Sequence, residues 1–184
     1  MQADPCVLVI FGASGDLTRR KLIPAMYEMH CSGLLPEEAC VLGTARRAKT
    51  DEEWREELTP WVQKYANRFE EESWRSFSQR LHYHACDATR DDAYPDLVEH
   101  IHTLSDSYLC SGNILFFLSV APQLYEPIVG CIDKAGLVTE GKRWCSIDPS
   151  TRSWQRIIVE KPFGNDEASA AALNRVLGRA FEEE

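Results

Sequence analysis

Short apolar runs alternate along the chain with longer stretches in which polar and apolar residues mix. The apolar runs predict five strands, Val7–Phe11, Cys40–Ala45, Leu81–Cys86, Ile114–Val120 and Arg156–Glu160. The stretches between and after them predict helices over Asp16–Gly33, Thr50–Phe69, Glu70–Arg80, Asp91–Ser105, Pro122–Ala135 and Asn165–Phe181. Strands that alternate with helices favour parallel pairing through right-handed crossovers. The pattern therefore predicts an α/β fold, a doubly wound parallel sheet with helices on both faces.

Local signals refine three of these elements. Pro24 lies inside the first helical stretch, so we expect a short first turn, a kink and a second helix that starts near Pro24. Thr50 and Glu53 have the spacing of a capping box, and Pro60 is expected to interrupt the helix that they begin. Residues 136–153 are predicted to be a loop, with a short strand or turn around "WCSIDPS".

Length, charge and composition limit the classes of function. The 184 residues suffice for one ordinary domain, 1–184, and 44% hydrophobic with 27% charged residues fits a globular protein. A net charge of −9 argues against a nucleic-acid partner but not against a small anionic ligand. We expect neither a membrane span, because no run of 18 apolar residues occurs, nor a signal peptide, because "MQADPC" lacks basic residues.

The seven cysteines are odd in number and include no C-x-x-C pair. This pattern favours reduced thiols in the cytoplasm and no metal site, with zinc binding or disulfides as alternatives.

The strongest candidate site is the turn after the first strand. Gly12 and Gly15 stand where parallel sheets of this kind bind ligands, at the carboxyl end of a strand where the strand order reverses. Glycines allow the sharp turn and a close approach of backbone N–H groups to a pyrophosphate, as in Rossmann-like domains. The spacing is G-x-x-G-x-x-T rather than G-x-G-x-x-G, and the larger Thr18 replaces the third glycine. Alternatively, the glycines only form the turn.

The residues after the second strand indicate which dinucleotide is bound. NAD-binding domains place a carboxylate there for the ribose 2′-hydroxyl, but this chain has Arg46 and Arg47. A guanidinium binds a 2′-phosphate through charge-assisted hydrogen bonds, so this position favours NADP. The alternative is a solvated basic loop.

The last strand also ends in a candidate group. Glu160, Lys161 and Pro162 stand at its carboxyl end, the ligand edge of a parallel sheet. We expect Lys161 to point into the crevice and to meet a substrate phosphate or hydroxyl. The alternative is an ordinary strand end with a solvated lysine.

Three motifs, "GASGDLTRRKLIP", "GTAR" and "IIVEKPFG", occur in this order. Together they resemble the amino-terminal coenzyme domain of the glucose-6-phosphate dehydrogenase family. "SGLLPEEACVLGTAR", "HACDATRDDAY" and "GNILFFLSVAP" extend the resemblance over nearly the whole chain. Two positions differ from the common pattern: Thr18 replaces alanine, which would loosen helix packing, and Phe117 replaces a tyrosine.

The resemblance implies a role for each matching residue. Ser14 and Arg46 would lie near the 2′-phosphate of NADP, Asp16 and Leu17 at the pyrophosphate, and Asp87 and Ala88 on the adenine side. Lys161 would reach both the substrate and the nicotinamide. The complete cofactor set is Gly12, Ala13, Ser14, Gly15, Asp16, Leu17, Thr18, Arg19, Arg46, Asp87, Ala88 and Lys161, and the substrate set is Lys161 and Lys21.

The implied reaction is oxidation of D-glucose 6-phosphate to 6-phospho-D-glucono-1,5-lactone, with hydride transfer to NADP, in the pentose phosphate pathway. The family's next segment carries the catalytic histidine and is followed by a substrate and dimerisation domain. None of the five histidines here matches that segment, so we expect no catalytic residue in this chain and weak or no turnover by this part alone. We expect a homodimer or tetramer only for the full-length enzyme, and an exposed apolar face on the isolated part.

Two alternatives remain open. One is another NAD(P)-dependent sugar oxidoreductase whose last strand also ends in glutamate–lysine–proline. The other is a non-catalytic nucleotide-binding module.

Overall fold

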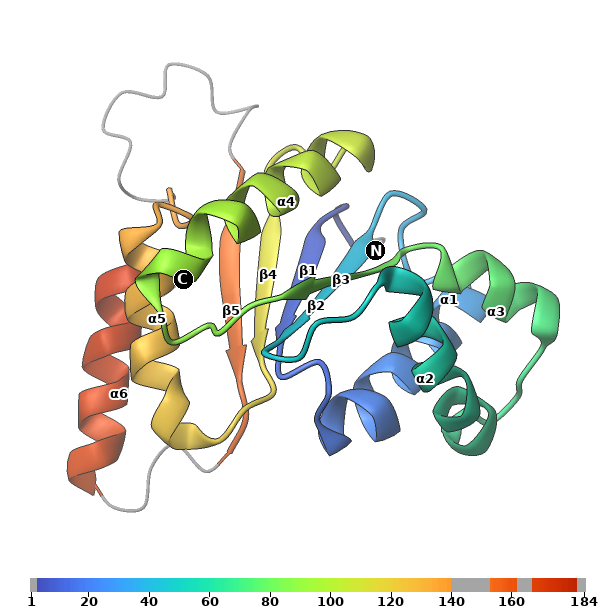
Figure 1. Cartoon of the computed structure of the whole chain (residues 1–184), viewed down its shortest axis with the longest axis horizontal. Coiled ribbons are helices and arrows are strands. Elements are labelled where there is room, and N and C mark those ends of the chain that lie inside the picture. Colours follow the sequence, from blue (N-terminus) through green and yellow to red (C-terminus); the bar gives the residue numbers. More distant parts are fainter. Residues whose placement is uncertain (1–2, 140–152, 162–166, 182–184) are drawn as a thin grey trace.

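Five parallel strands form one sheet in the order β3-β2-β1-β4-β5 (Figure 1). The computed structural model describes residues 3–139, 153–161 and 167–181. The strands are β1 Val7–Phe11, β2 Cys40–Ala45, β3 Leu81–Ala85, β4 Ile114–Leu118 and β5 Gln155–Val159. Every neighbouring pair is parallel, and Phe11 at the end of β1 is level with Thr44 and Leu118. The predicted parallel sheet is confirmed, and its strand order reverses beside β1.

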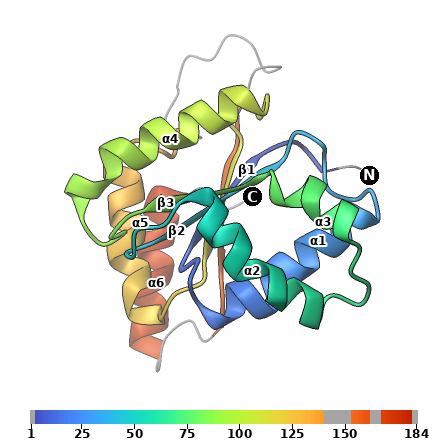
Figure 2. The same cartoon turned by 45° about the vertical axis from the view of Figure 1, so that its right-hand side comes forward.

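Helices cover both faces of the sheet, as predicted (Figures 1 and 2). One face carries α1 Ile23–Cys31, α2 Asp51–Tyr65 and α3 Glu71–Ser78, and the other carries α4 Tyr94–Ser107, α5 Tyr125–Lys134 and α6 Glu167–Ala180. Single 3₁₀ turns, Asp91–Ala93 and Pro122–Leu124, precede α4 and α5. The segment "WCSIDPS" and Pro162 lie outside the described residues.

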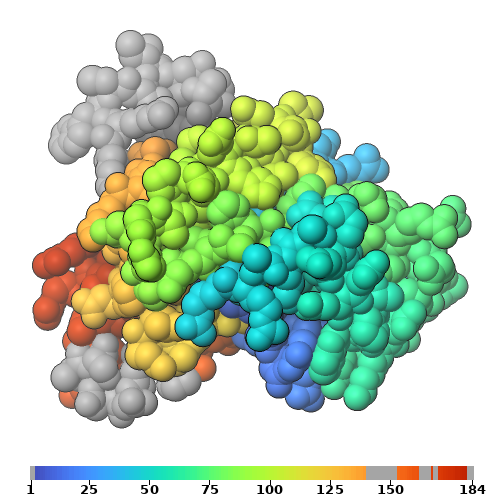
Figure 3. Space-filling view, viewed as in Figure 1, coloured from blue at the N-terminus to red at the C-terminus, as the bar shows by residue number. Residues whose placement is uncertain are grey.

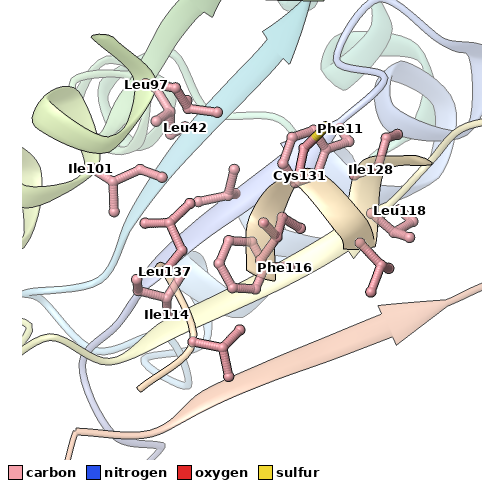
Figure 4. Packing of buried hydrophobic residues seen from close by; sticks show 14 of the residues in the cluster. Phe11, Leu42, Leu97, Ile101, Ile114, Phe116, Leu118, Ile128, Cys131 and Leu137 are labelled. Atoms are coloured by element: carbon pink, nitrogen blue, oxygen red, sulfur yellow. The ribbon is translucent and has the colours of Figure 1, made fainter. Parts of the chain in front are cut away.

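Each face has its own hydrophobic core. Figure 4 shows Leu97 and Ile101 of α4 pointing toward Leu42 of β2, in the cluster that also holds Phe11 and Phe116. The opposite cluster contains Ile10, Tyr27, Trp54, Phe77 and Tyr83. Residues of β1 and β2 therefore face apolar surroundings on both sides, which is why these strands read as continuous apolar runs.

The predicted start of a second helix near Pro24 is confirmed, since α1 begins at Ile23. A π-helical turn, Thr18–Leu22, leads directly into α1, and Pro24 lies in the first turn of α1. A proline is tolerated there because first-turn N–H groups have no partner within the helix.

The expectation that Pro60 interrupts its helix is wrong. The capping box of Thr50 and Glu53 is present, but α2 continues through Pro60 to Tyr65. Trp54, Leu58 and Val62 are buried on the sheet side of α2, and this packing holds residues on both sides of the proline in helical register.

Candidate nucleotide site

The turn after β1 is tied to both neighbouring strands. The backbone N–H groups of Gly12 and Ala13 donate to the Thr44 carbonyl at the end of β2, at 3.0 and 3.1 Å. Gly12 has φ +95°, and a Cβ there would lie 2.1 Å from the carbonyl oxygen of Ser119, which follows β4. Only glycine fits at this position, so the turn depends on it.

Thr18 strengthens this turn instead of loosening it. The side chain is completely buried, with Oγ1 3.1 Å from the Gly12 carbonyl oxygen and 3.2 Å from Ser119 Oγ. The expectation of looser packing at Thr18 is therefore wrong. Its hydroxyl replaces the close helix–strand contact of a third glycine with hydrogen bonds.

A cavity of about 300 Å³ opens at the carboxyl ends of β1, β2, β3 and β4. Figure 3 shows the blue turn after β1 reaching the surface between the cyan loop after β2 and the yellow start of α5. Six predicted cofactor residues line the cavity, Gly12, Ser14, Gly15, Arg46, Asp87 and Ala88. The structure thus brings together residues that follow three different strands, β1, β2 and β3.

Several lining residues were not predicted. They include Thr44, Thr89, Ser119, Val120, Leu124 and Ile128. Ser119 and Val120 follow β4, which lies beside β1, so a prediction of the strand order would have pointed to them. Sequence alone suggested alternating strands and helices but did not fix which strands are neighbours.

The wall of this cavity that follows β2 and β3 carries both a guanidinium, Arg46, and a carboxylate, Asp87. Hydrogen bonds from the Thr89 hydroxyl (2.7 Å) and the Thr89 N–H (3.2 Å) are the largest causes that lower the pKa of Asp87, and Arg46 lowers it further. Asp87 is therefore ionised near neutral pH.

A second cavity, of about 310 Å³, lies on the other side of Ser14. Arg19 and Arg47 line it together with Ala13, Ser14, Trp54, Glu57, Leu58 and Trp61. The Arg19 guanidinium lies 4.4 Å from the centroid of the Trp61 ring. The two consecutive arginines after β2 therefore line different cavities: Arg46 lines the first and Arg47 lines the second. Ser14 lines both cavities.

Three other predicted residues lie outside both cavities. Asp16 is exposed and accepts a hydrogen bond from Arg19 Nε (2.8 Å), and this contact is the main reason why its pKa is lowered. Leu17 packs against the core around α1, and Lys21 is exposed on the π-helical turn. The structure places these residues at the start of the first helix without bringing them to the cavity walls.

Lys161 is exposed at the carboxyl end of β5 and lines neither cavity. The carbonyl of the preceding Glu160 accepts a hydrogen bond from the Tyr125 hydroxyl at 3.2 Å, which ties this strand end to α5. Lys161 and Gly12 thus both follow the carboxyl end of a strand, at the same edge of the sheet. Their strands, β5 and β1, are not neighbours, because β4 lies between them.

The described ranges contain no group of three or more His, Cys, Asp or Glu residues that could hold a metal ion. Cys6, Cys31, Cys40, Cys86, Cys110 and Cys131 are free thiols. A search of the same ranges found no helix with the length and apolarity needed to cross a membrane.

The strand order, the glycine turn at the reversal point and the cavity beside it are those of a Rossmann-like dinucleotide-binding domain. Residues 9–184 match the family model described as glucose-6-phosphate dehydrogenase, NAD binding domain. The chain belongs to this family.

Known proteins similar to this chain agree with that assignment. A glucose-6-phosphate 1-dehydrogenase of Aggregatibacter actinomycetemcomitans is 40% identical over 183 residues, which are 100% of this chain and 35% of that protein. One of Chlamydia pneumoniae is 36% identical over 97% of this chain and 34% of its own length. A solved structure of glucose-6-phosphate dehydrogenase in complex with its substrate glucose-6-phosphate superposes with a TM-score of 0.82 at 29% identity, over 99% of this chain and 36% of that one. The chain spans about a third of the length of these relatives.

Proposed function

We propose that residues 1–184 form the NADP-binding domain of a glucose-6-phosphate 1-dehydrogenase. The whole enzyme would oxidise D-glucose 6-phosphate to 6-phospho-D-glucono-1,5-lactone and transfer the hydride to NADP, in the pentose phosphate pathway. Family membership and the names of the relatives support this over another sugar oxidoreductase or a non-catalytic module. The free thiols among the described cysteines support a cytoplasmic location for the enzyme.

The observation that carries the proposal is the first cavity, where the glycine turn and Arg46 meet. The donors present fit a phosphorylated dinucleotide. N–H groups at the start of the helix after Gly15 would bind the pyrophosphate, and the Ser14 hydroxyl with the Arg46 guanidinium would bind the 2′-phosphate. Asp87 and Ala88 would border the adenine. When bound, NADP would supply the hydride acceptor.

The substrate side is less complete in this chain. We propose that Lys161 and Lys21 contact the substrate, because a lysine ammonium can bind a sugar phosphate as a point charge. Abstraction of the C1 hydroxyl proton needs a base with a pKa near neutral pH. The five histidines, all described, line neither cavity, so we assign no catalytic base here. A homodimer or tetramer is proposed only for the full-length enzyme.

The test is to titrate NADP into this chain by calorimetry and then to assay it with D-glucose 6-phosphate. We expect one NADP per chain and no formation of reduced nicotinamide. A chain that folds but binds no NADP would contradict the proposed function. Turnover comparable to that of a complete relative would contradict the assignment of the base to a region outside this chain.

A further inference from the structure

Tyr83 connects the core to the loop after β2. The residue lies on β3, is 5% exposed, and its ring centroid is 5.6 Å from that of Trp54 in the core under α2. Its hydroxyl donates to the Arg47 carbonyl at 2.7 Å and lies 3.4 Å from the Ala45 carbonyl oxygen. A buried side chain thus holds the backbone of a loop whose residues 46–48 are exposed.

The Ser14 side chain of the glycine turn acts on the same hydroxyl and lowers the pKa of Tyr83. Burial is the larger cause and raises that pKa overall, so the phenol keeps its proton and remains a donor to the Arg47 carbonyl at neutral pH. Tyr83 lines neither cavity itself, so its contact with the surroundings of the proposed nucleotide site is the hydrogen bond to the loop.

We propose that Tyr83 is a positioning residue for the discrimination between NADP and NAD, because its hydroxyl holds the backbone of the Arg46–Arg47 loop. The inference rests on the proposed function. Without this contact, the Ser14 hydroxyl and the Arg46 guanidinium would no longer be held at a fixed separation across the 2′-phosphate. Ordering them would then cost conformational entropy at each binding event. NAD lacks the 2′-phosphate, so its Kd would not depend on this contact.

The test compares Tyr83→Phe with Tyr27→Phe by calorimetric titration with NADP and with NAD. Tyr27 is a matched control: it is completely buried in the same core, and its hydroxyl also bonds backbone, accepting from the Glu70 N–H at 2.8 Å. Loss of one such hydrogen bond should raise the Kd for NADP about three- to tenfold in Tyr83→Phe and leave the Kd for NAD within about twofold. Tyr27→Phe should change neither Kd beyond about twofold.

A second measurement separates positioning from general loosening of the fold. In an Arg46→Ala background, Tyr83→Phe should weaken NADP binding less than it does alone, since the group that it positions is gone. Three outcomes would overturn the inference: an equal loss of affinity for NADP and NAD, an equal loss of NADP affinity in the wild-type and Arg46→Ala backgrounds, or no loss of affinity at all. A folded wild-type chain without preference for NADP would instead refute the proposed function, on which the inference depends.

Discussion

The two edge strands of the sheet, β3 and β5, differ in how far side chains of the chain cover them. At β3, the side chains of α2 cover the strand backbone: Asp51 Oδ1 accepts from the Tyr83 N–H at 2.7 Å, and Arg55 Nε donates to the Leu81 carbonyl at 2.9 Å. At β5, Arg156 is exposed and Ile158 is 39% exposed on one face of the strand. Side chains that occupy edge backbone groups prevent another strand from pairing there.

The same contrast appears in the proposed site. Six residues assigned to the nucleotide line the cavity at the ends of β1, β2 and β3, and Leu124 and Ile128 add to its wall. Lys161, assigned to both the nicotinamide and the substrate, is exposed at the end of β5. Residues of four strand ends and of the start of α5 thus line the cavity beside β1, whereas the end of β5 is exposed to solvent.

The largest effect is expected at Gly12, where the two sides of the sheet meet. Gly12→Ala would place a Cβ 2.1 Å from the Ser119 carbonyl oxygen at a φ of +95°. We expect the free energy of unfolding in urea to fall by more than about 3 kcal/mol. Gly33→Ala is the control, because Gly33 has φ +64° but open space around it, and should lose only about 1–2 kcal/mol. Similar losses for both variants would contradict this account of the turn.

Truncating one isoleucine on β1 and one on β5 compares the packing of these two strands directly. Ile10 on β1 is completely buried, whereas Ile158 on β5 is 39% exposed. Ile10→Ala should lower the free energy of unfolding by about 2–5 kcal/mol. Ile158→Ala should lower it by less than about 1.5 kcal/mol, because much of that side chain already contacts water. Urea denaturation measures both, and equal losses would remove the contrast between the two sides.

The contact of Asp51 with the backbone of β3 should make a smaller but measurable contribution to the free energy of unfolding. Asp51→Ala leaves the buried N–H of Tyr83 without its acceptor and should cost about 1–3 kcal/mol of unfolding free energy. The control is Glu52→Ala, whose 73% exposed side chain lies 3.5 Å from Arg55 and should contribute within about 0.5 kcal/mol. A loss at Glu52 as large as that at Asp51 would show that local charge, not backbone cover, stabilises this edge.

The sequence predicted the sheet well, because apolar runs bounded by glycine reflect strands buried on both faces. It located β1 and β2 to the residue and found the glycine turn. It failed at Pro60, where packing of Trp54 and Val62 on the sheet outweighs the local cost of proline. The basic pair itself did not separate Arg46 from Arg47, and only the family resemblance selected Arg46; in the structure Arg46 lines the first cavity and Arg47 the second. It also missed Ser119, which reaches the site only through the strand order.

The smallest effect concerns pH. His84 on β3 and His100 on α4 have their Nδ1 atoms 3.3 Å apart, and burial is the main cause that lowers the pKa of both. As the pH falls below about 6.5, the unfolded chain therefore takes up protons before the folded chain, and stability is lost. Asp96 opposes the shift at His84 only in part.

Melting temperatures between pH 7 and pH 5 measure this dependence. We expect a decline that is shallower in a His84→Gln, His100→Gln double variant than in wild type. His102→Gln, in an exposed position of the same helix, should keep the wild-type slope. Burial raises the pKa of Asp51, but hydrogen bonds from His82 and the Tyr83 N–H lower it overall, so its contribution is lost only at lower pH. An unchanged slope in the double variant would exclude the pair as the cause.

The central claim is that the cavity beside β1 binds NADP through Arg46, and the ratio of the Kd values for NAD and NADP tests it most directly. Calorimetry on the wild-type chain should give a ratio of about ten or more, since one charge-assisted contact contributes about 1.5–3 kcal/mol. Arg46→Ala should bring the ratio close to one by weakening NADP alone, while Arg68→Ala, exposed in the loop before α3, should leave it unchanged. A wild-type ratio near one, or a high ratio that survives Arg46→Ala, would contradict the account.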